Sequence, residues 1–195
     1  MLKIHTLTLG MYQTNTYIIH EEASKSCCVI DPGYSAGIIL EKLEELGLTP
    51  DAILLTHGHF DHVGAVKDLA ADTDCRVFLC ADDDQLPPMF TAGKLYFTDT
   101  YTEGSILNIA GLFIHVLHTP GHTPGSVCLM CDDALFSGDT LFAGSCGRTD
   151  IGGSWTAIQK SLKRLSAMEA DFRVFPGHGE STTLAAEKRY NPYMR

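Results

Sequence analysis

Residues 54–63 read LLTHGHFDHV, which places three histidines and an aspartate within six positions, directly after an apolar run. The apolar run has the composition of a buried strand. In an extended segment His57 and His59 project to the same side, so both imidazoles can reach one point beyond the end of the strand. Asp61 and His62 follow about one turn later and can face a second point. The stretch therefore predicts a strand whose end carries two groups of chemically active side chains.

Three later segments also end an apolar run with a ligand-type residue in a glycine-rich turn. They are TPGHTPGS with His122, FSGDTLF with Asp139 and FPGHGE with His178. A lone loop histidine is more often a hydrogen-bonded structural residue than a ligand, but four strand ends of one kind are poorly explained by coincidence. Imidazole nitrogen and carboxylate oxygen suit zinc and other borderline divalent metals.

Together these segments hold five histidines and two aspartates, more donors than one four-coordinate ion uses. The sequence therefore predicts two divalent metal ions, zinc first, with iron or manganese as alternatives. The predicted ligands are His57, His59, Asp61, His62, His122, Asp139 and His178.

The composition is that of an ordinary globular protein. With 195 residues, of which 45% are hydrophobic and 19% charged, we expect a single domain over residues 1–195. A formal net charge of −10 without clustered Lys or Arg argues against nucleic acid as a partner. The chain lacks an apolar stretch of the roughly 18 to 20 residues that a membrane span needs, and its first residues do not resemble a secretory signal. We expect a cytoplasmic protein that does not bind membranes.

The seven cysteines are odd in number and scattered, which favours reduced thiols over a disulfide framework. Cys128 and Cys131 form a C-x-x-C, but they lie in the apolar run SVCLMC, which has the character of a strand. Residues three apart on a strand face opposite sides, so this pair is not expected to share a metal or form a redox site.

Hydrophobic periodicity predicts an α/β succession of elements. Strands are expected at residues 3–9, 15–20, 27–30, 51–56, 75–80, 112–118, 126–131, 134–137 and 172–175. Helices are expected at residues 38–46, 64–70, 155–168 and 182–190. Two sheets packed face to face, with the helices outside, would bury these strands on both faces.

Residues 82–102 are the least regular part of the chain, with DDD, two prolines and several aromatic residues. We expect a long surface loop with a short helix. Its aromatic residues could form a lid or a pocket wall, but anchoring of the loop on itself is the favoured interpretation.

The motif set resembles that of the metallo-β-lactamase superfamily. THGHFDH matches its H-x-H-x-D-H signature, and TPGHTPGS, SGDTLF and PGHG match its later motifs in order. The resemblance extends from VIDPG at residues 29–33 to PGHG at residues 176–179. It implies a four-layer αββα sandwich, in agreement with the predicted elements. It also implies that one metal is bound by His57, His59 and His122. The other metal would be bound by Asp61, His62 and His178, with Asp139 bridging the two.

Asp31 matches a family position near the metals. The resemblance implies that its carboxylate holds a ligand histidine in one tautomer and one orientation. An ordinary Asp-Pro-Gly turn is an equally good interpretation of the same residues.

Within the superfamily, HGHFDH and LFAGSCGR resemble hydroxyacylglutathione hydrolases, also called glyoxalase II. In that family a basic residue after Cys-Gly binds the glycine carboxylate of glutathione, and Arg148 occupies that place; an ion pair with Asp150 is the alternative. The resemblance implies that a hydroxide held between two metal ions attacks a small-molecule thioester such as S-2-hydroxyacylglutathione. Asp61 and Asp139 are then the candidate catalytic residues, with Asp61 orienting the nucleophile or moving its proton.

The chain departs from glyoxalase II in two respects. Only residues 180–195 follow the PGHG turn, whereas full-length glyoxalase II continues into a C-terminal helical domain that also contacts glutathione. The last motif reads PGHGEST and lacks the tyrosine that the family places shortly afterwards. We therefore expect a compact thioesterase with a relaxed demand for glutathione, and we disfavour β-lactam hydrolysis.

Two other classes of function remain open from the sequence. GRTD, at residues 147–150, also occurs in the related persulfide dioxygenases, which use a single iron. In that alternative His57, His122 and Asp139 would hold the iron, and the reaction would be an oxidation. A third alternative is a protein whose metals only stabilise the fold.

Overall fold

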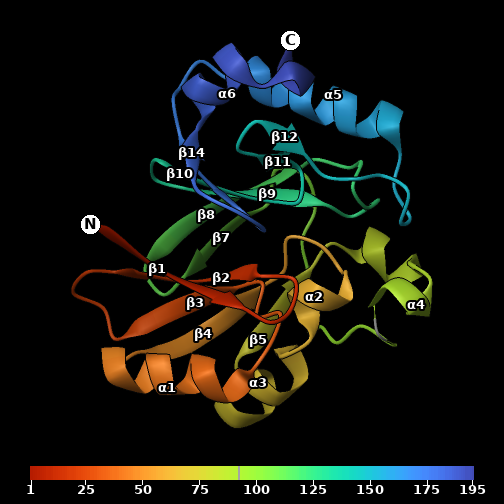
Figure 1. Cartoon of the computed structure of the whole chain (residues 1–195). Coiled ribbons are helices and arrows are strands. Elements are labelled where there is room, and N and C mark those ends of the chain that lie inside the picture. The colour runs from red at the N-terminus through yellow and green to blue at the C-terminus, as the bar shows by residue number, and fades with distance from the viewer. Residues whose placement is uncertain (92) are drawn as a thin grey trace.

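The computed structural model describes residues 1–91 and 93–195 as two six-stranded sheets packed face to face, with helices on both outer faces (Figure 1). This is the four-layer αββα sandwich expected from the sequence. None of the helices in these two ranges combines the length and the hydropathy that a membrane crossing requires.

The first half of the chain forms one sheet, with strand order β1-β2-β3-β4-β5-β6, and the helices on its outer face. Pairing is antiparallel from β1 to β3 and parallel from β3 to β6. The elements are β1 (Leu2–Leu9), β2 (Thr14–Glu21), β3 (Ser26–Ile30), α1 (Ala36–Leu46), β4 (Thr49–Leu54), α2 (Phe60–Val63), α3 (Val66–Thr73), β5 (Arg76–Leu79), η1 (Ala81–Gln85), α4 (Pro88–Thr91) and β6 (Asp99–Thr100).

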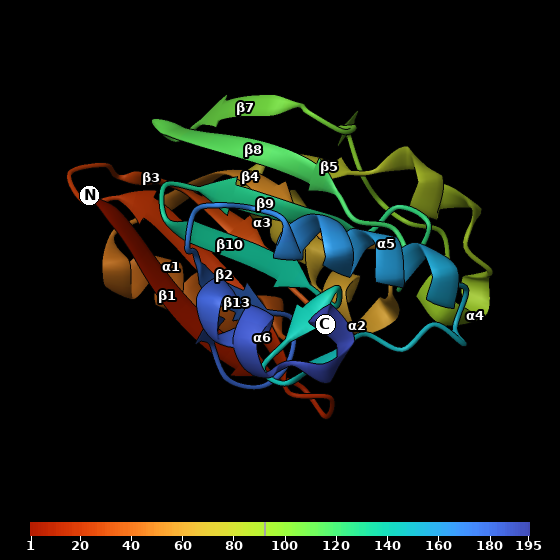
Figure 2. The same cartoon turned by 90° about the horizontal axis from the view of Figure 1, so that it is seen from above.

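The second half forms the other sheet, with order β14-β13-β10-β9-β8-β7, in which only β10 and β13 pair in parallel. Figure 2 shows α5 and α6 lying over this sheet. The elements are β7 (Ile106–Ile109), β8 (Leu112–His118), β9 (Val127–Cys131), β10 (Ala134–Gly138), β11 (Leu141–Phe142), β12 (Ser145–Cys146), α5 (Trp155–Ser166), β13 (Arg173–Pro176), β14 (Thr182–Thr183), α6 (Leu184–Tyr190) and η2 (Pro192–Met194).

Three apolar cores separate the four layers. One lies between the first sheet and α1 and α3, one between the two sheets, and one between the second sheet and α5 and α6. Cys128 contributes to the outer core and Cys131 to the core between the sheets, so the two face opposite sides of β9 as predicted. All seven cysteines are free thiols in the described chain. Burial on both faces explains why the central strands are almost continuously apolar.

Some elements differ from the sequence prediction. The missed strand β7 is a short edge strand whose residues are only partly buried or exposed, so its apolar signal is weak. The helix predicted at residues 64–70 corresponds to α3, which runs from Val66 to Thr73, and the short helix α2 before it was not predicted. The helix predicted at residues 182–190 begins only at Leu184. There, Thr183 pairs with β13 and caps α6 by accepting a hydrogen bond from Ala186 N.

The fold brings the four motif-bearing turns together. His57, His122, Asp139 and His178 follow the carboxyl ends of β4, β8, β10 and β13, respectively. Thr14, at the start of β2, forms an isolated bridge with His178. The two sheets therefore both contribute residues to one edge of the sandwich.

Candidate metal centre

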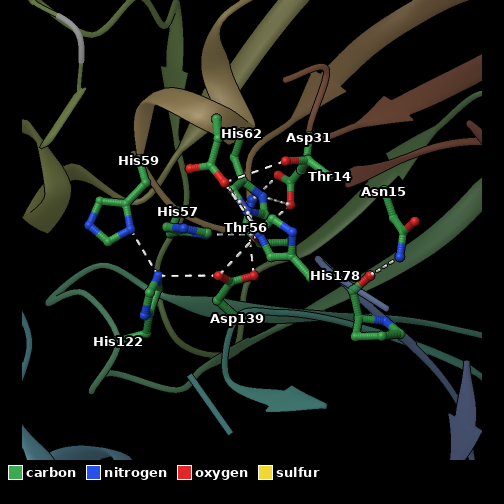
Figure 3. Close-up of polar contacts among 12 residues, drawn as sticks. Thr14, Asn15, Asp31, Thr56, His57, His59, His62, His122, Asp139 and His178 are labelled. Atoms are coloured by element: carbon green, nitrogen blue, oxygen red, sulfur yellow. Dashed lines mark hydrogen bonds and ion pairs between the residues drawn. The ribbon is translucent and has the colours of Figure 1, made fainter. Parts of the chain in front are cut away.

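The first cluster consists of His57, His59 and His122, which are buried (Figure 3). Each ring offers a nitrogen to a set whose members all lie within 4.8 Å of one another. The second ring nitrogens contact groups outside the set. His59 Nε2 is 3.0 Å from the carbonyl oxygen of Ile151, and His122 Nδ1 is 2.7 Å from that of Arg148. Because a carbonyl only accepts, these nitrogens carry the hydrogen, and both rings turn an unprotonated nitrogen towards the cluster.

Two such nitrogens, His59 Nδ1 and His122 Nε2, are 2.8 Å apart. Lone pairs at this separation repel each other unless a proton or a cation is shared. The His57 ring also places its hydrogen on the nitrogen that faces away from the cluster. Thr56 Oγ1 donates to Asp31 Oδ2 over 2.6 Å, so His57 Nδ1 donates to Thr56 Oγ1 over 3.1 Å. His57 Nε2 is then left buried without a hydrogen-bond partner among the described residues. The donor set fits a divalent cation.

The second cluster consists of Asp61, His62 and His178, again with ligand-type atoms within 4.8 Å of one another. His62 Nδ1 donates to Asp31 Oδ2 over 2.9 Å, and His178 Nδ1 donates to the carbonyl oxygen of Tyr12 over 3.0 Å. Both rings therefore direct Nε2 inward, where the two nitrogens are 3.3 Å apart. His178 Nε2 also lies 3.2 Å from Asp61 Oδ2.

Asp139 lies between the clusters (Figure 3). Its Oδ1 is 3.4 Å from His62 Nε2, and its Oδ2 is 3.4 Å from His122 Nε2 and 3.5 Å from His178 Nε2. Asp139 Oδ1 is buried and, like His57 Nε2, has no hydrogen-bond partner in the described part of the chain. A Cβ on Gly177 would come within 2.2 Å of this oxygen, which explains the glycine of the PGHG turn. All seven predicted ligands thus converge on one place.

A cavity of about 590 Å³ opens beside the two clusters. Asp61, Asp139 and His178 lie on its wall, and four aromatic rings form much of the rest: Tyr12, Phe60, Phe90 and Phe142. Phe90 comes from the irregular segment at residues 82–102, so part of that segment is a pocket wall. Other parts anchor it, because Leu95 and Phe97 pack against the core beneath the first sheet. The segment thus forms a pocket wall at Phe90, and at Leu95 and Phe97 it is anchored on the core of the first sheet rather than on itself.

A profile of the Metallo-beta-lactamase superfamily matches residues 9–178, which include all seven predicted ligands. The chain belongs to the metallo-β-lactamase superfamily. Membership, with the paired His/Asp clusters, makes it a metal-dependent hydrolase that binds divalent metals.

Relatives of similar length have related names. The chain is 33% identical over 209 residues to "Hydroxyacylglutathione hydrolase GloC" of Haemophilus influenzae, covering 99% of this chain and 98% of that protein. It is 35% identical over 208 residues to "Probable metallo-hydrolase YqgX" of Bacillus subtilis, again covering 99% and 98%. Both similarities span nearly the whole of each protein.

Solved structures of this superfamily have the same fold. BLEG-1 B3 metallo-beta-lactamase has a TM-score of 0.89 and 35% identity, with 100% of this chain and 99% of that one covered. TTHA1623 in a di-iron-bound form has a TM-score of 0.85 and 39% identity, with 97% and 99% covered. ETHE1 from Myxococcus xanthus has a TM-score of 0.82 and 30% identity, with 97% and 83% covered. The four-layer sandwich is thus the metallo-β-lactamase fold.

Two histidines of the first cluster and two of the second have pKa values shifted in opposite directions. Burial lowers the pKa of His57 well below its usual value and that of His59 to about 4, and neighbouring histidines add to both shifts. Burial also disfavours a charge on His62, but Asp139 and Asp31 outweigh it and hold the pKa of His62 well above its usual value. Burial is likewise outweighed at His178, whose pKa is raised by Asp61 and Asp139. Without metal, His62 and His178 therefore hold protons more tightly than His57 and His59 do.

Metal binding should release those protons. At pH 6.5, where an ordinary histidine is half protonated, His62 and His178 hold more than half a proton each and must lose them to become ligands. We expect zinc loading to release more than about one proton per chain, and zinc affinity to fall as the pH is lowered. Calorimetry at this pH, in two buffers of different ionisation enthalpy, measures the release. In Asp31→Asn, which lacks one charge holding the proton on His62, the release should be smaller; identical heats in both buffers would contradict the assignment.

Asp31 lies directly behind His62. Its carboxylate accepts hydrogen bonds from Thr56 N over 2.7 Å, from Thr56 Oγ1 and from His62 Nδ1. Through Thr56 it also orients His57, so one carboxylate supports a ring in each cluster. The position of Asp31 agrees with the family resemblance, and its effect on metal binding stays a prediction.

Sequence reasoning missed several supporting residues. Asn15 donates from Nδ2 to the carbonyl oxygens of Pro176 and Gly179 over 3.1 and 2.9 Å, and so fixes the turn that carries His178. An asparagine at the start of an otherwise apolar strand was the available signal. Asp83 is also buried, and burial raises the pKa of its carboxyl while hydrogen bonds from Gly125 and Gly58 oppose the shift. Nothing in the run DDD distinguishes it from its neighbours.

Proposed function

We propose that this protein is a glyoxalase II-like thioesterase, which hydrolyses S-2-hydroxyacylglutathione or a similar thioester with the help of two divalent ions, most simply zinc. The observation that carries the proposal is Asp139 lying within 3.4 to 3.5 Å of nitrogens from both histidine clusters. The similarity to a hydroxyacylglutathione hydrolase over 98% of that protein supports the substrate class. The di-iron form of TTHA1623 supports a site for two ions and leaves iron as an alternative.

The two clusters divide the ligands. We propose that the first ion is held by His57, His59 and His122. The second would be held by Asp61, His62 and His178, with Asp139 shared. Bound there, the ions would lower the pKa of a water molecule towards about 7 and polarise the thioester carbonyl.

The side chains around the ions have separate tasks. Burial raises the pKa of Asp61, but the hydrogen bond with His178 and the charge of His62 outweigh it, so the pKa is lowered and the carboxylate is ionised at neutral pH. Asp61 lies on the cavity wall, where Oδ2 can accept a proton from an attacking water. The rings of Phe60 and Phe90 cover the same cavity with apolar surface and reduce its access to water.

Arg148 is the substrate-binding candidate. Its side chain lines the cavity and is exposed, with Nε 2.6 Å from Asp150 Oδ1. The ion pair with Asp150, one of the two interpretations, is therefore present, and substrate binding by Arg148 is our proposal. An exposed ion pair of this kind is weak in water, so a substrate carboxylate can replace Asp150 on the guanidinium fork.

Arg148→Ala is expected to raise KM for glutathione thioesters about tenfold with little change in kcat, because it removes binding that substrate and transition state share. Arg173→Ala is the matched control, since Arg173 forms a similar exposed pair with Asp133, with Nε 2.8 Å from Oδ2, and is not among the cavity residues. Steady-state kinetics on S-lactoylglutathione measure both variants. Equal KM values in Arg148→Ala and the parent protein would remove Arg148 from the site.

Metal analysis and a substrate panel test the proposed function. We expect close to two ions per chain after loading, and hydrolysis of a thioester in preference to a β-lactam. One iron per chain, with oxygen consumption on glutathione persulfide, would instead establish the dioxygenase alternative. Two ions without turnover of any of these substrates would leave a metal-stabilised protein without this activity.

We also propose that residues 1–195 act as one domain, because an apolar core lies between each pair of neighbouring layers in the sandwich. Free cysteines, most of them buried, fit the reducing conditions of the cytoplasm.

A further inference from the structure

Asp83 is a buried carboxylate outside the seven proposed ligands. It lies in η1, after β5, and has 0% exposure, whereas its neighbours Asp82 and Asp84 are both exposed. Burying a charge is unfavourable unless strong hydrogen bonds replace its water. We therefore expect specific hydrogen bonds to the Asp83 carboxylate. The exposed carboxylates of its two neighbours do not require such bonds, because water solvates them.

Three donors surround the Asp83 carboxylate. Oδ2 accepts from Gly58 N over 2.7 Å and from Thr123 Oγ1 over 2.9 Å. Oδ1 accepts from Gly125 N over 2.6 Å. Gly58 lies between two members of the first cluster, and Thr123 directly follows the third. One carboxylate thus joins the turn after β4 in the first sheet to the turn after β8 in the second.

The glycines of both turns accommodate this carboxylate. A Cβ on Gly125 would lie 2.7 Å from Asp83 Oδ1, closer than such atoms can approach. A Cβ on Gly58 would lie 3.3 Å from Asp83 Cβ and 2.9 Å from a methyl group of Leu95. The absence of side chains at these two positions is therefore explained by contact with η1 and the segment that follows it.

The second cluster is supported differently. His62 is oriented by Asp31, and His178 by the carbonyl oxygen of Tyr12. The sheets also remain joined without Asp83, because Val127 N donates to Thr56 O over 2.9 Å in the backbone. Loss of the Asp83 carboxylate would therefore release the turns that carry the first cluster while leaving the supports of the second cluster in place.

We propose that Asp83 is a positioning residue for the first cluster, which sets the separation of the turn bearing His57 and His59 from the turn bearing His122. The inference rests on the proposed function for the assignment of these histidines as ligands. It predicts that removal of the charge weakens metal binding at the first cluster only. Residues behind metal ligands typically change metal affinity by about 10- to 100-fold, and we expect Asp83→Asn to fall in that range.

The test measures zinc affinity of the full chain by competition with a chromophoric chelator, in two backgrounds. His178→Ala disables the second cluster, so its tightest zinc reports the first, and there Asp83→Asn should weaken binding about 10- to 100-fold. His59→Ala disables the first cluster, and there the same change should weaken binding less than about twofold, because Asp83 forms no hydrogen bond with Asp61, His62 or His178 in the described chain. Asp84→Asn, an exposed neighbour in the same run, is the matched control and should leave both affinities unchanged.

The outcomes separate the inference from the proposed function. Equal weakening in both backgrounds, or none in either, overturns the role of Asp83, because a general packing role would not distinguish the clusters. A folded parent protein that binds no zinc overturns the proposed metal assignment as well. If Asp83→Asn does not fold, Thr123→Val removes one of the three donors and should give the same selective loss at smaller size; an affinity unchanged at the first cluster would then reject the proposal.

Discussion

Asp139→Ala is expected to reduce thioester hydrolysis by more than about 100-fold, beyond the loss that follows removal of a residue merely behind a metal ligand. The Asp139 carboxylate lies within 3.4 to 3.5 Å of histidine nitrogens from both clusters. Without it, neither of the two proposed ions would have its full donor set, and His62 would lose one of the charges that raise its pKa. Metal content measured on the same sample should fall below two ions per chain.

Two further variants test whether the loss of activity is due to the charge of Asp139. Asp139→Asn keeps the shape of the side chain and removes its charge, so it should lose most of the activity while the fold is retained. Asp133→Ala is a suitable control because it removes an exposed aspartate that pairs with Arg173 at the opposite end of β10 from Asp139. Full activity and two bound ions in Asp139→Asn would show that the carboxylate is not shared by metals.

Removal of the metals should abolish hydrolysis and also lower the thermal stability of the protein. The carboxylates of Asp31, Asp61 and Asp139 gather around the clusters, and ions that bind only the folded chain stabilise it by mass action. At free zinc about 1,000 times Kd, one site contributes about 4 kcal/mol. For a chain of this length that is a shift of about 10 °C in Tm, which calorimetry or circular dichroism measures.

The loss of activity and of thermal stability can be attributed to the metals only if it is reversible. Adding zinc after dialysis against a chelator should restore both Tm and activity, with a break near two equivalents. In Asp139→Ala, the rise in Tm on adding zinc should be much smaller than in the parent protein. An enzyme that keeps its turnover after complete demetallation would exclude metal-dependent hydrolysis by this site.

The sequence was sufficient for the fold and for the location of the seven candidate ligands. Four of the candidate ligands each follow an apolar strand in a glycine-rich turn: His57, His122, Asp139 and His178. The carboxyl ends of these four strands meet at one edge of the sandwich. Strand periodicity and turn composition are local signals, so they could be recognised without the structure. The prediction of the fold, which the structure confirms, therefore depends only on sequence features that lie within a few residues of each other.

The supports of the site could not be predicted in the same way. Thr56, Asn15 and Asp83 act through contacts with residues 25 to 164 positions away. Nothing in the immediate sequence marks Thr56 or Asp83, and the polar start of an apolar strand is the only local signal at Asn15. Asp83 shows the difficulty most clearly, since three identical aspartates stand together and only the path of η1 buries the middle one. Long-range hydrogen bonds to backbone groups leave no pattern in a single sequence.

The turn at residues 10–13 joins substrate shape to metal chemistry. The Tyr12 ring lines the cavity, while its own carbonyl oxygen accepts the hydrogen bond from His178 Nδ1. A substitution that widens the cavity here for a bulkier acyl chain would also shift the backbone oxygen that orients His178 Nε2 towards the metal cluster. Directed evolution at this hairpin should therefore screen variants for bound zinc alongside turnover, because altered selectivity and a half-empty centre would arise from the same change.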